Sequence, residues 1–173
     1  MKNVSRILIM VTVLVGAFAM PAIAGQILLK FKGGIGVIPV SRVAGTQNAD
    51  GTFPNVVRND VRGVPPGGQP WVIESLNADV MDDGRIRVDG RGLLLAGGNG
   101  IGTRGGTAQQ PQQVRAVLFC GPDAHSSDLV ELQPDGDFRI NDVLDPPPPN
   151  PCDTPVLLIV SGGGSWFAAG IPQ

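Results

Sequence analysis

The chain has 173 residues, with 13 Lys and Arg against 15 Asp and Glu, and a net charge of −2. Nothing in this balance indicates the basic face that nucleic-acid binding requires, so we expect no nucleic-acid partner. With 25 glycines, 16 prolines and no helical spacing of apolar residues beyond residue 24, a mainly helical protein is also excluded.

Residues 1–24 have the pattern of a secretory signal peptide. Lys2 and Arg6 precede an apolar run from Ile7 to Ala19, and Ala22 to Ala24 forms a small-residue cleavage site. The run is shorter than the about 20 residues of a membrane span. We predict cleavage after this site, the alternative being an uncleaved N-terminal anchor. No later segment is long and apolar enough to span a bilayer, so we expect no membrane span after cleavage.

Residues 25–173 are predicted to form a single domain in the periplasm or outside the cell. Loss of the signal peptide leaves 11 basic and 15 acidic residues, a net charge of −4. Cys120 and Cys152 are the only cysteines, and in an oxidising compartment they are predicted to form a disulfide. The alternative, a catalytic or metal-binding thiol, lacks a polarising neighbour and would oxidise after export.

The mature chain shows short alternating runs separated by turn residues. The predicted strands are Gln26–Phe31, Gly36–Val43, Val56–Arg62, Trp71–Met81, Arg85–Leu95, Gln113–Cys120, Leu129–Gln133, Phe138–Val143, Val156–Ser161 and Ser165–Ala169. Many short strands of this kind are typical of two packed sheets or of one sheet closed on itself. We predict an all-β fold, a single β-sandwich domain of immunoglobulin-like form with one disulfide.

Two hairpins are predicted from the residues at their turns. The turn ending at Gly84 places Val80 opposite Ile86 and Asp79 opposite Arg87. Glycine stands third in the loop, where a type I turn followed by a left-handed residue needs a positive φ. The hairpin therefore has one apolar face and one charged face.

The second hairpin repeats this pattern. Its turn ends at Gly136 and is predicted to place Leu132 opposite Phe138 and Glu131 opposite Arg139. We attribute the similarity of the two hairpins to the demands of the turn and the pleat rather than to duplication.

The segment from Ala96 to Gln113 is the candidate binding loop. Its stretch from Gly100 to Gly105 fits the phosphate-binding pattern G-x-G-x-x-G, but the eight residues that follow cannot hold the required helix. We therefore predict no nucleotide cofactor. Loops of this length are usually functional or disordered, so Asn99, Thr103 and Arg104 are predicted to be binding groups.

No catalytic residue and no metal site are predicted. His125, the single histidine, lies beside Asp123, Ser126 and Ser127, too close in sequence to form a working triad, and we interpret it as a surface loop histidine. No calcium-loop pattern is present, and Asp before Gly is explained by turn conformation.

Arg85, Arg87 and Arg91 fall on one face of a predicted strand, with Asp89 among them. This pattern is either an anion-binding stripe or, in the interpretation that we favour, a solvated sheet face paired with Asp79.

The large aromatic residues Trp71, Trp166 and Phe167 have two possible roles. Exposed aromatic rings bind sugars, whereas in a domain with few rings we expect these to anchor the core.

The stretches "GVPPGGQPWVI", "DDGRIRVDGRGLLLAG", "VRAVLFC" and "PCDTPVLLI" followed by "WFAAG" carry a resemblance. The mature chain resembles a group of exported bacterial proteins of no assigned function, over most of Val64 to Gly170. The resemblance implies no activity and no site residue.

The sequence favours an exported, non-enzymatic binding or structural module whose partner is an unknown protein or a cell-surface polymer. One alternative is a hydrolase of an extracellular polymer that uses carboxylates such as Glu74 or Glu131. Another is a filament subunit that assembles by pairing of strand edges.

Overall fold

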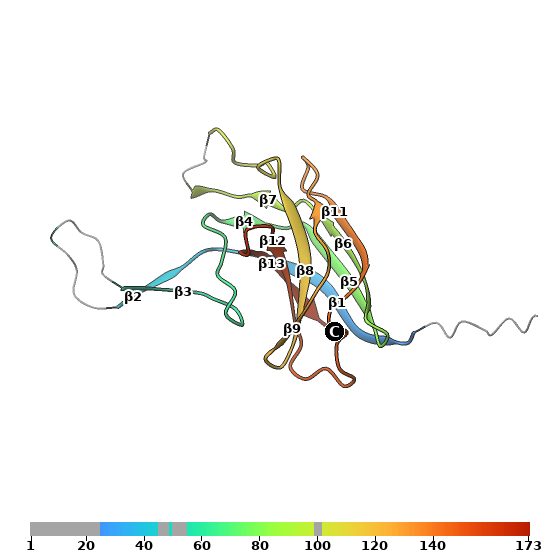
Figure 1. Cartoon of the computed structure of the whole chain (residues 1–173). Coiled ribbons are helices and arrows are strands. Elements are labelled where there is room, and N and C mark those ends of the chain that lie inside the picture. The colour runs from blue at the N-terminus through green and yellow to red at the C-terminus, as the bar shows by residue number, and fades with distance from the viewer. Residues whose placement is uncertain (1–24, 45–48, 50–54, 99–101) are drawn as a thin grey trace, which may run out of the picture.

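The computed structural model describes residues 25–44, 49, 55–98 and 102–173 (Figure 1). The predicted signal peptide lies outside these residues. The described residues form β1 (Ile27–Gly36), β2 (Ser41–Ala44), β3 (Asn55–Arg58), β4 (Trp71–Val72), β5 (Ser75–Met81), β6 (Arg85–Arg91), β7 (Leu94–Leu95), β8 (Gln113–Cys120), β9 (Asp123–Ser126), β10 (Val130–Glu131), β11 (Phe138–Val143), β12 (Val156–Ser161) and β13 (Trp166–Pro172). No stretch of this part of the chain is a helix with the length and hydrophobicity needed to cross a bilayer. The all-β prediction is confirmed.

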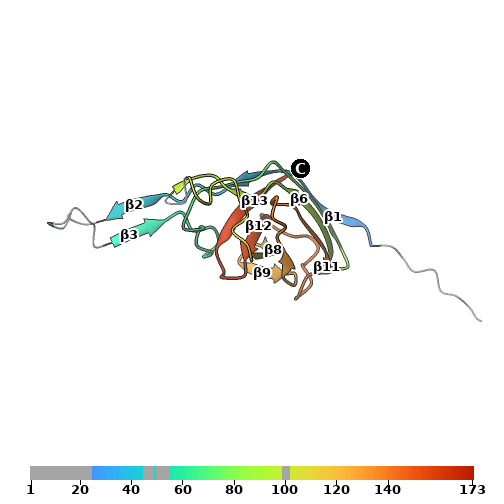
Figure 2. The same cartoon turned by 90° about the horizontal axis from the view of Figure 1, so that it is seen from above.

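Nine strands belong to one antiparallel sheet, in the order β10-β8-β12-β13-β1-β5-β6-β11, with β9 paired to β8. The sheet curls, as the view from above shows (Figure 2), and its two ends meet. Ser126 and Asp145 form a bridge between them, and the Asp128 amide donates to Asp142 Oδ2 at 2.7 Å. The immunoglobulin-like form is not confirmed, because these strands curl as one sheet.

Alternation of side chains creates the core inside this curl. In β5 and β6 every second residue is buried, including Leu76, Val80 and Ile86, while the residues between them face outward. Strands β8 and β12 bury nearly every side chain, as expected for strands covered on both faces. Their mostly apolar sequences explain why their predicted bounds are confirmed.

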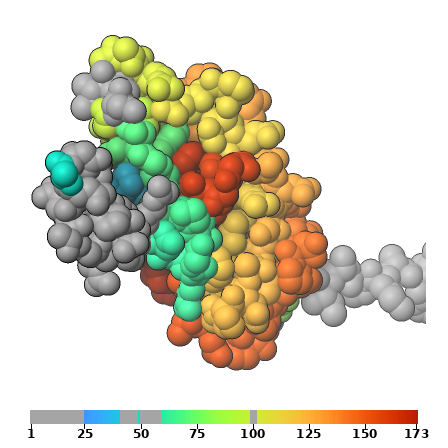
Figure 3. Space-filling model, turned by 60° about the vertical axis from the view of Figure 1, so that its left-hand side comes forward, coloured from blue at the N-terminus to red at the C-terminus, as the bar shows by residue number. Residues whose placement is uncertain are grey.

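The segment from Val61 to Trp71 packs against β13. The Gly67 amide donates to the Trp166 carbonyl at 2.9 Å, and the Trp71 ring stacks on Phe167 with centroids 4.1 Å apart. Figure 3 shows this segment, in aquamarine and green, beside the red residues of the β12–β13 turn. Both tryptophans are buried, which confirms that they anchor the core.

The first predicted hairpin is confirmed and the second only in part. Val80 lies opposite Ile86 and Asp79 opposite Arg87, and Gly84 has φ 86°. The second turn also forms, with Gly136 at φ 84°. Its two strands then diverge: β10 pairs with β8, whereas β11 pairs with β6 at the other end of the sheet. The predicted ladder between them is absent from the described strand pairings because the turn joins the two ends of the curled sheet.

We expect Gly136→Ala to lower the free energy of unfolding by about 2 kcal/mol or more, through a positive φ and a steric clash. A Cβ at Gly136 would lie 2.5 Å from the Leu93 nitrogen, and backbone atoms do not move as a flexible side chain does. Gly106→Ala is the matched control, because Gly106 has φ 77° but no atom within 4 Å of an added Cβ. Urea denaturation should show a clearly smaller loss for the control. Equal losses would mean that the crowding at Leu93 has no effect.

Candidate functional site

The outer face of strands β1, β5, β6 and β11 carries six exposed Lys and Arg side chains. We call it the basic face. It exists because the inward positions of these strands are apolar, which leaves the charged residues outside. Its basic residues are Lys30, Lys32, Arg85, Arg87, Arg91 and Arg139, all exposed. Asp79 and Asp89 are half-buried among them.

The strand register arranges this face in two rows. The first row consists of Lys30, Asp79, Arg87 and Asn141, and the second of Lys32, Asn77, Asp89 and Arg139. Neighbouring strands are about 4.8 Å apart, so positive, negative and amide groups alternate at close spacing. The six cations are accompanied by Asp79, Asp89 and Asp83, which pairs with Arg85, and Glu131 and Asp137 add two acids at the edge of the face. The face keeps a small excess of positive charge on a chain that is negative overall.

Asp89 is the main acidic partner on the basic face. Its Oδ2 lies 3.1 Å from Arg139 Nε, and its Oδ1 lies 3.5 Å from Arg91 Nε. These side chains are solvent-exposed, Arg139 to 79%, and such pairs contribute only about 0 to 1 kcal/mol. The arginines therefore remain open to an outside anion.

Arg85 is engaged differently, at the turn before β6. Its Nε lies 2.7 Å from Asp83 Oδ2, and its backbone amide donates to Asp83 Oδ1 at 3.2 Å. Loss of hydration acts to raise the pKa of Asp83, but these hydrogen bonds and the charge of Arg85 outweigh it and hold the pKa below its ordinary value. The Asp83 contribution to stability is thus present above the ordinary carboxyl pKa and is lost as the pH falls through the lowered one.

Two shallow depressions of about 430 Å³ each hollow the basic face. The first is lined by polar groups of Asp89, Arg91, Glu131, Asp137 and Arg139, and the second by those of Asn77, Asp79, Arg87, Asp89, Arg139 and Asn141. Asp89 and Arg139 line both. Their ion pair therefore stands between the two hollows.

Part of the predicted binding loop packs against the body of the fold. Thr103 and Arg104 lie together in an exposed turn, while Asn99 lies outside the described residues. Beyond the turn the chain returns to the body: the Gly106 amide donates to the Leu95 carbonyl at 2.7 Å, and Ala108 is fully buried. Neither Thr103 nor Arg104 lines the two depressions, so a role for this loop stays a prediction.

The interpretation of His125 as a surface histidine is wrong. It lies in β9, a strand that the polar sequence concealed, opposite Leu118, and is only 3% exposed. Its Nδ1 lies 2.8 Å from the Pro146 carbonyl oxygen. The Ser127 hydroxyl donates to the Asp128 carbonyl and accepts the Ala116 amide, so it does not engage His125. These contacts describe a buried structural residue rather than a triad.

The two carboxylates proposed for a hydrolase have different surroundings. Glu131 lines the first depression, whereas Glu74 does not. Asp137, which shares that depression, accepts the Gly92 amide at 3.1 Å, and Asp89 is held by arginines. Within the described residues no three acidic, histidine or cysteine side chains gather as a metal site would require.

The predicted disulfide is confirmed: Cys120 and Cys152 are bonded, with Cα atoms 4.9 Å apart. A disulfide is compatible with a location outside the cytoplasm.

Sequence reasoning identified the arginines of β6 but missed Lys30, Lys32 and Arg139 as their neighbours. The alternation in "LKFKG" places both lysines on one face of a strand, yet nothing in the sequence says that this strand lies beside β5. The fold thus extends the charged stripe of β6 into a four-strand surface. Comparisons with protein-family models, with curated proteins and with solved structures find no match to this chain.

Proposed function

We propose that this protein is an exported, non-enzymatic binding module that holds an acidic polysaccharide on its basic face. The observation that carries the proposal is the set of six exposed cations on four adjacent strands. Three of them, Arg87, Arg91 and Arg139, line two depressions on either side of the pair of Asp89 and Arg139. A regularly spaced array of charges suits a long, repetitive polyanion better than a small ligand. The disulfide supports export, because such bonds persist in oxidising compartments.

The mixture of groups favours a polysaccharide over nucleic acid. Asn77 and Asn141 offer amide groups, and Asp79 and Asp89 offer acceptors, between the cations. These amide and carboxylate groups can form hydrogen bonds with the hydroxyls that a polysaccharide presents beside its carboxylates, whereas a DNA backbone presents phosphates without hydroxyls.

We expect R87Q/R139Q to weaken binding to polygalacturonate about ten-fold, because two exposed charge contacts are lost. Isothermal titration should show this loss at low salt, weaker binding of the wild type at high salt through screening, and no binding to neutral dextran. R104Q is the matched control, since Arg104 is an exposed arginine of the candidate loop.

Three results would contradict this proposal. Loss of binding in R104Q with R87Q/R139Q unaffected would place the site on the loop. Tighter binding of single-stranded DNA than of polygalacturonate would identify the wrong polymer class. Cleavage of the polysaccharide by the wild type and not by E131Q would show a hydrolase.

The filament alternative is not favoured by the closure of the main sheet. Its two ends are joined at Ser126 and Asp145 and by the turn before β11, which leaves little free edge there for another chain. The paired strands β2 and β3 are the edges that this alternative would use. Sedimentation of the mature protein as a monomer at high concentration would exclude it.

A further inference from the structure

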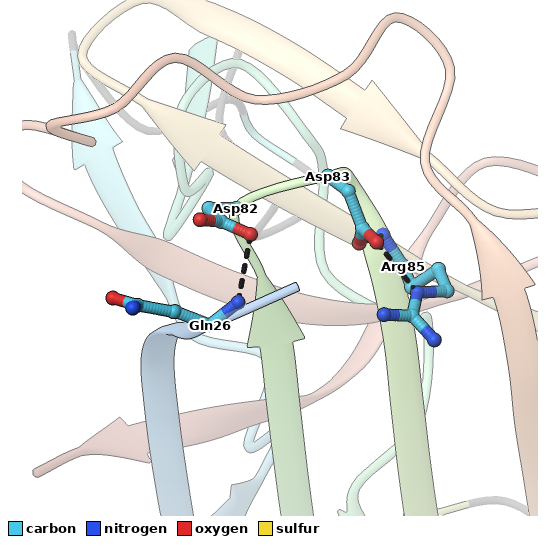
Figure 4. Close-up of polar contacts among 4 residues, drawn as sticks. All are labelled: Gln26, Asp82, Asp83 and Arg85. Atoms are coloured by element: carbon cyan, nitrogen blue, oxygen red, sulfur yellow. Dashed lines mark hydrogen bonds and ion pairs between the residues drawn. The ribbon is translucent and has the colours of Figure 1, made fainter. Parts of the chain in front are cut away.

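The six cations of the basic face differ in whether they already have an acidic partner. Asp89 Oδ2 lies 3.1 Å from Arg139 Nε, and Asp89 Oδ1 lies 3.5 Å from Arg91 Nε. Figure 4 shows Arg85 turned to Asp83, with 2.7 Å between its Nε and Asp83 Oδ2. Among the described residues, no ion pair is found for the other three cations, which are Lys30, Lys32 and Arg87.

The two depressions of the basic face differ in charge. The lining of the first holds three carboxylates and two arginines, whereas that of the second holds two carboxylates and two arginines. The second also lies nearer the unpaired lysines of β1, because its Asp79 is directly opposite Lys30. Its Asn77 is opposite Lys32 in the same way. An acidic polymer is therefore expected over the second depression, held first by Arg87 and the two lysines.

Arg139 borders this depression, and its charge is already offset by Asp89. A carboxylate from outside must either displace Asp89 from Arg139 Nε or bind a guanidinium whose charge is partly neutralised. Asp89 is tethered beside the arginine, so its effective concentration does not fall on dilution, whereas the concentration of a free ligand does. The ion pair is exposed and therefore weak, which means that a ligand of high local concentration can displace Asp89.

We propose that Asp89 is a tethered competitor, through which the basic face selects polymers with charges on several neighbouring sugars over single charged sugars. This inference rests on the proposed function. A polymer that is held by Arg87 and the lysines of β1 presents its next carboxylate to Arg139 at a high local concentration. One uronate cannot contact Arg87 and Arg139 together and has no such anchor. Selectivity thus comes from a competing group of the protein as well as from its attractive groups.

The test compares the wild type with D89N for binding of galacturonate, which has one carboxylate, and of polygalacturonate, at the same ionic strength. We expect D89N to bind galacturonate about two- to five-fold more tightly, the effect of removing a competing exposed ion pair. The gain for polygalacturonate should be smaller, because the polymer already displaces Asp89 in the wild type. Asparagine loses the charge but keeps an acceptor oxygen for sugar hydroxyls. Nuclear magnetic resonance titration of the arginine Nε–H signals gives the affinity for galacturonate.

The matched control is D79N, which removes the same charge from the same face. Asp79 makes no ion pair among the described residues, so D79N should raise the affinity for galacturonate less than D89N does. In R139Q, the further change D89N should lose most of its effect. D89S, which shortens the side chain as well, should repeat the gain of D89N and so exclude an effect of the asparagine itself.

Three results would overturn this inference while leaving the proposed function intact: equal affinities of the wild type and D89N for galacturonate, weaker binding by D89N, or equal gains in D79N and D89N. In each of these cases the wild type still binds polygalacturonate. Failure of both the wild type and D89N to bind polygalacturonate would instead overturn the proposed function, and this inference with it.

Discussion

Replacing Cys120 and Cys152 together by serine is expected to lower the free energy of unfolding by about 2 to 5 kcal/mol. The disulfide joins the last residue of β8 to the segment that leads into β12, across 32 residues of sequence. Without it, the unfolded chain gains the freedom of an open loop of that length. A backbone hydrogen bond of 2.7 Å from Gly121 to Asp153 remains at the site, so the fold should persist with reduced stability.

The double variant is preferable to a single one, because a single serine would leave a free thiol. Urea denaturation should compare the oxidised wild type, the wild type with reductant and the double variant. The last two should unfold at the same urea concentration. A double variant within about 0.5 kcal/mol of the oxidised wild type would show that the bond contributes little, the result found for many engineered disulfides.

Replacing Phe138 by alanine should destabilise the protein by about 3 to 5 kcal/mol, the usual cost of emptying a buried aromatic site. Phe138 is 3% exposed and lies directly opposite Gly90 on β6. Its ring occupies the space of the absent side chain: a Cβ on Gly90 would lie 2.1 Å from Phe138 Cζ. The glycine is therefore required by the ring rather than by the backbone.

The contact between Phe138 and Gly90 predicts that the two substitutions have strongly non-additive effects on the free energy of unfolding. Gly90→Ala alone should cost about 1 to 3 kcal/mol, because the ring must move out of a packed core. In the F138A background the same change should cost almost nothing, since the clash has gone. Denaturation of the two single variants and the double variant gives the coupling energy directly. Additive losses would mean that the ring and the glycine do not share this space.

Local sequence determined much of the fold. The bounds of β8, β11 and β12 are as predicted because each strand is a continuous or alternating apolar run between turn residues. The turns at Gly84 and Gly136 are also as predicted, since a left-handed residue there requires glycine.

Long-range pairing was the part that the sequence could not supply. The polar stretch containing His125 shows no strand pattern, and it forms β9 only because β8 lies beside it. Likewise, the two arms of the second hairpin alternate well, but nothing local reveals that they belong to opposite ends of a curled sheet. In both cases the structure was determined by pairing between distant segments rather than by the local preference of the sequence.

The candidate site, like the fold, was predictable only where it depends on local sequence. The arginines of β6 share a face by simple alternation, which the sequence displays. Their union with Lys30, Lys32 and Arg139 depends on which strands become neighbours. Asp89 illustrates the limit: its position near Arg91 is local, but its shorter contact, to Arg139, comes from β11.

The place of β1 in the sheet has a consequence for how the protein is made. This first strand lies between β5 and β13, and its Phe31 is opposite Pro172. The ribosome therefore releases β1 long before its second partner exists, and the hydrogen-bond ladder on that side stays open until β13 emerges. Such distant pairing slows folding. This side of the sheet can therefore be completed only when synthesis is nearly finished.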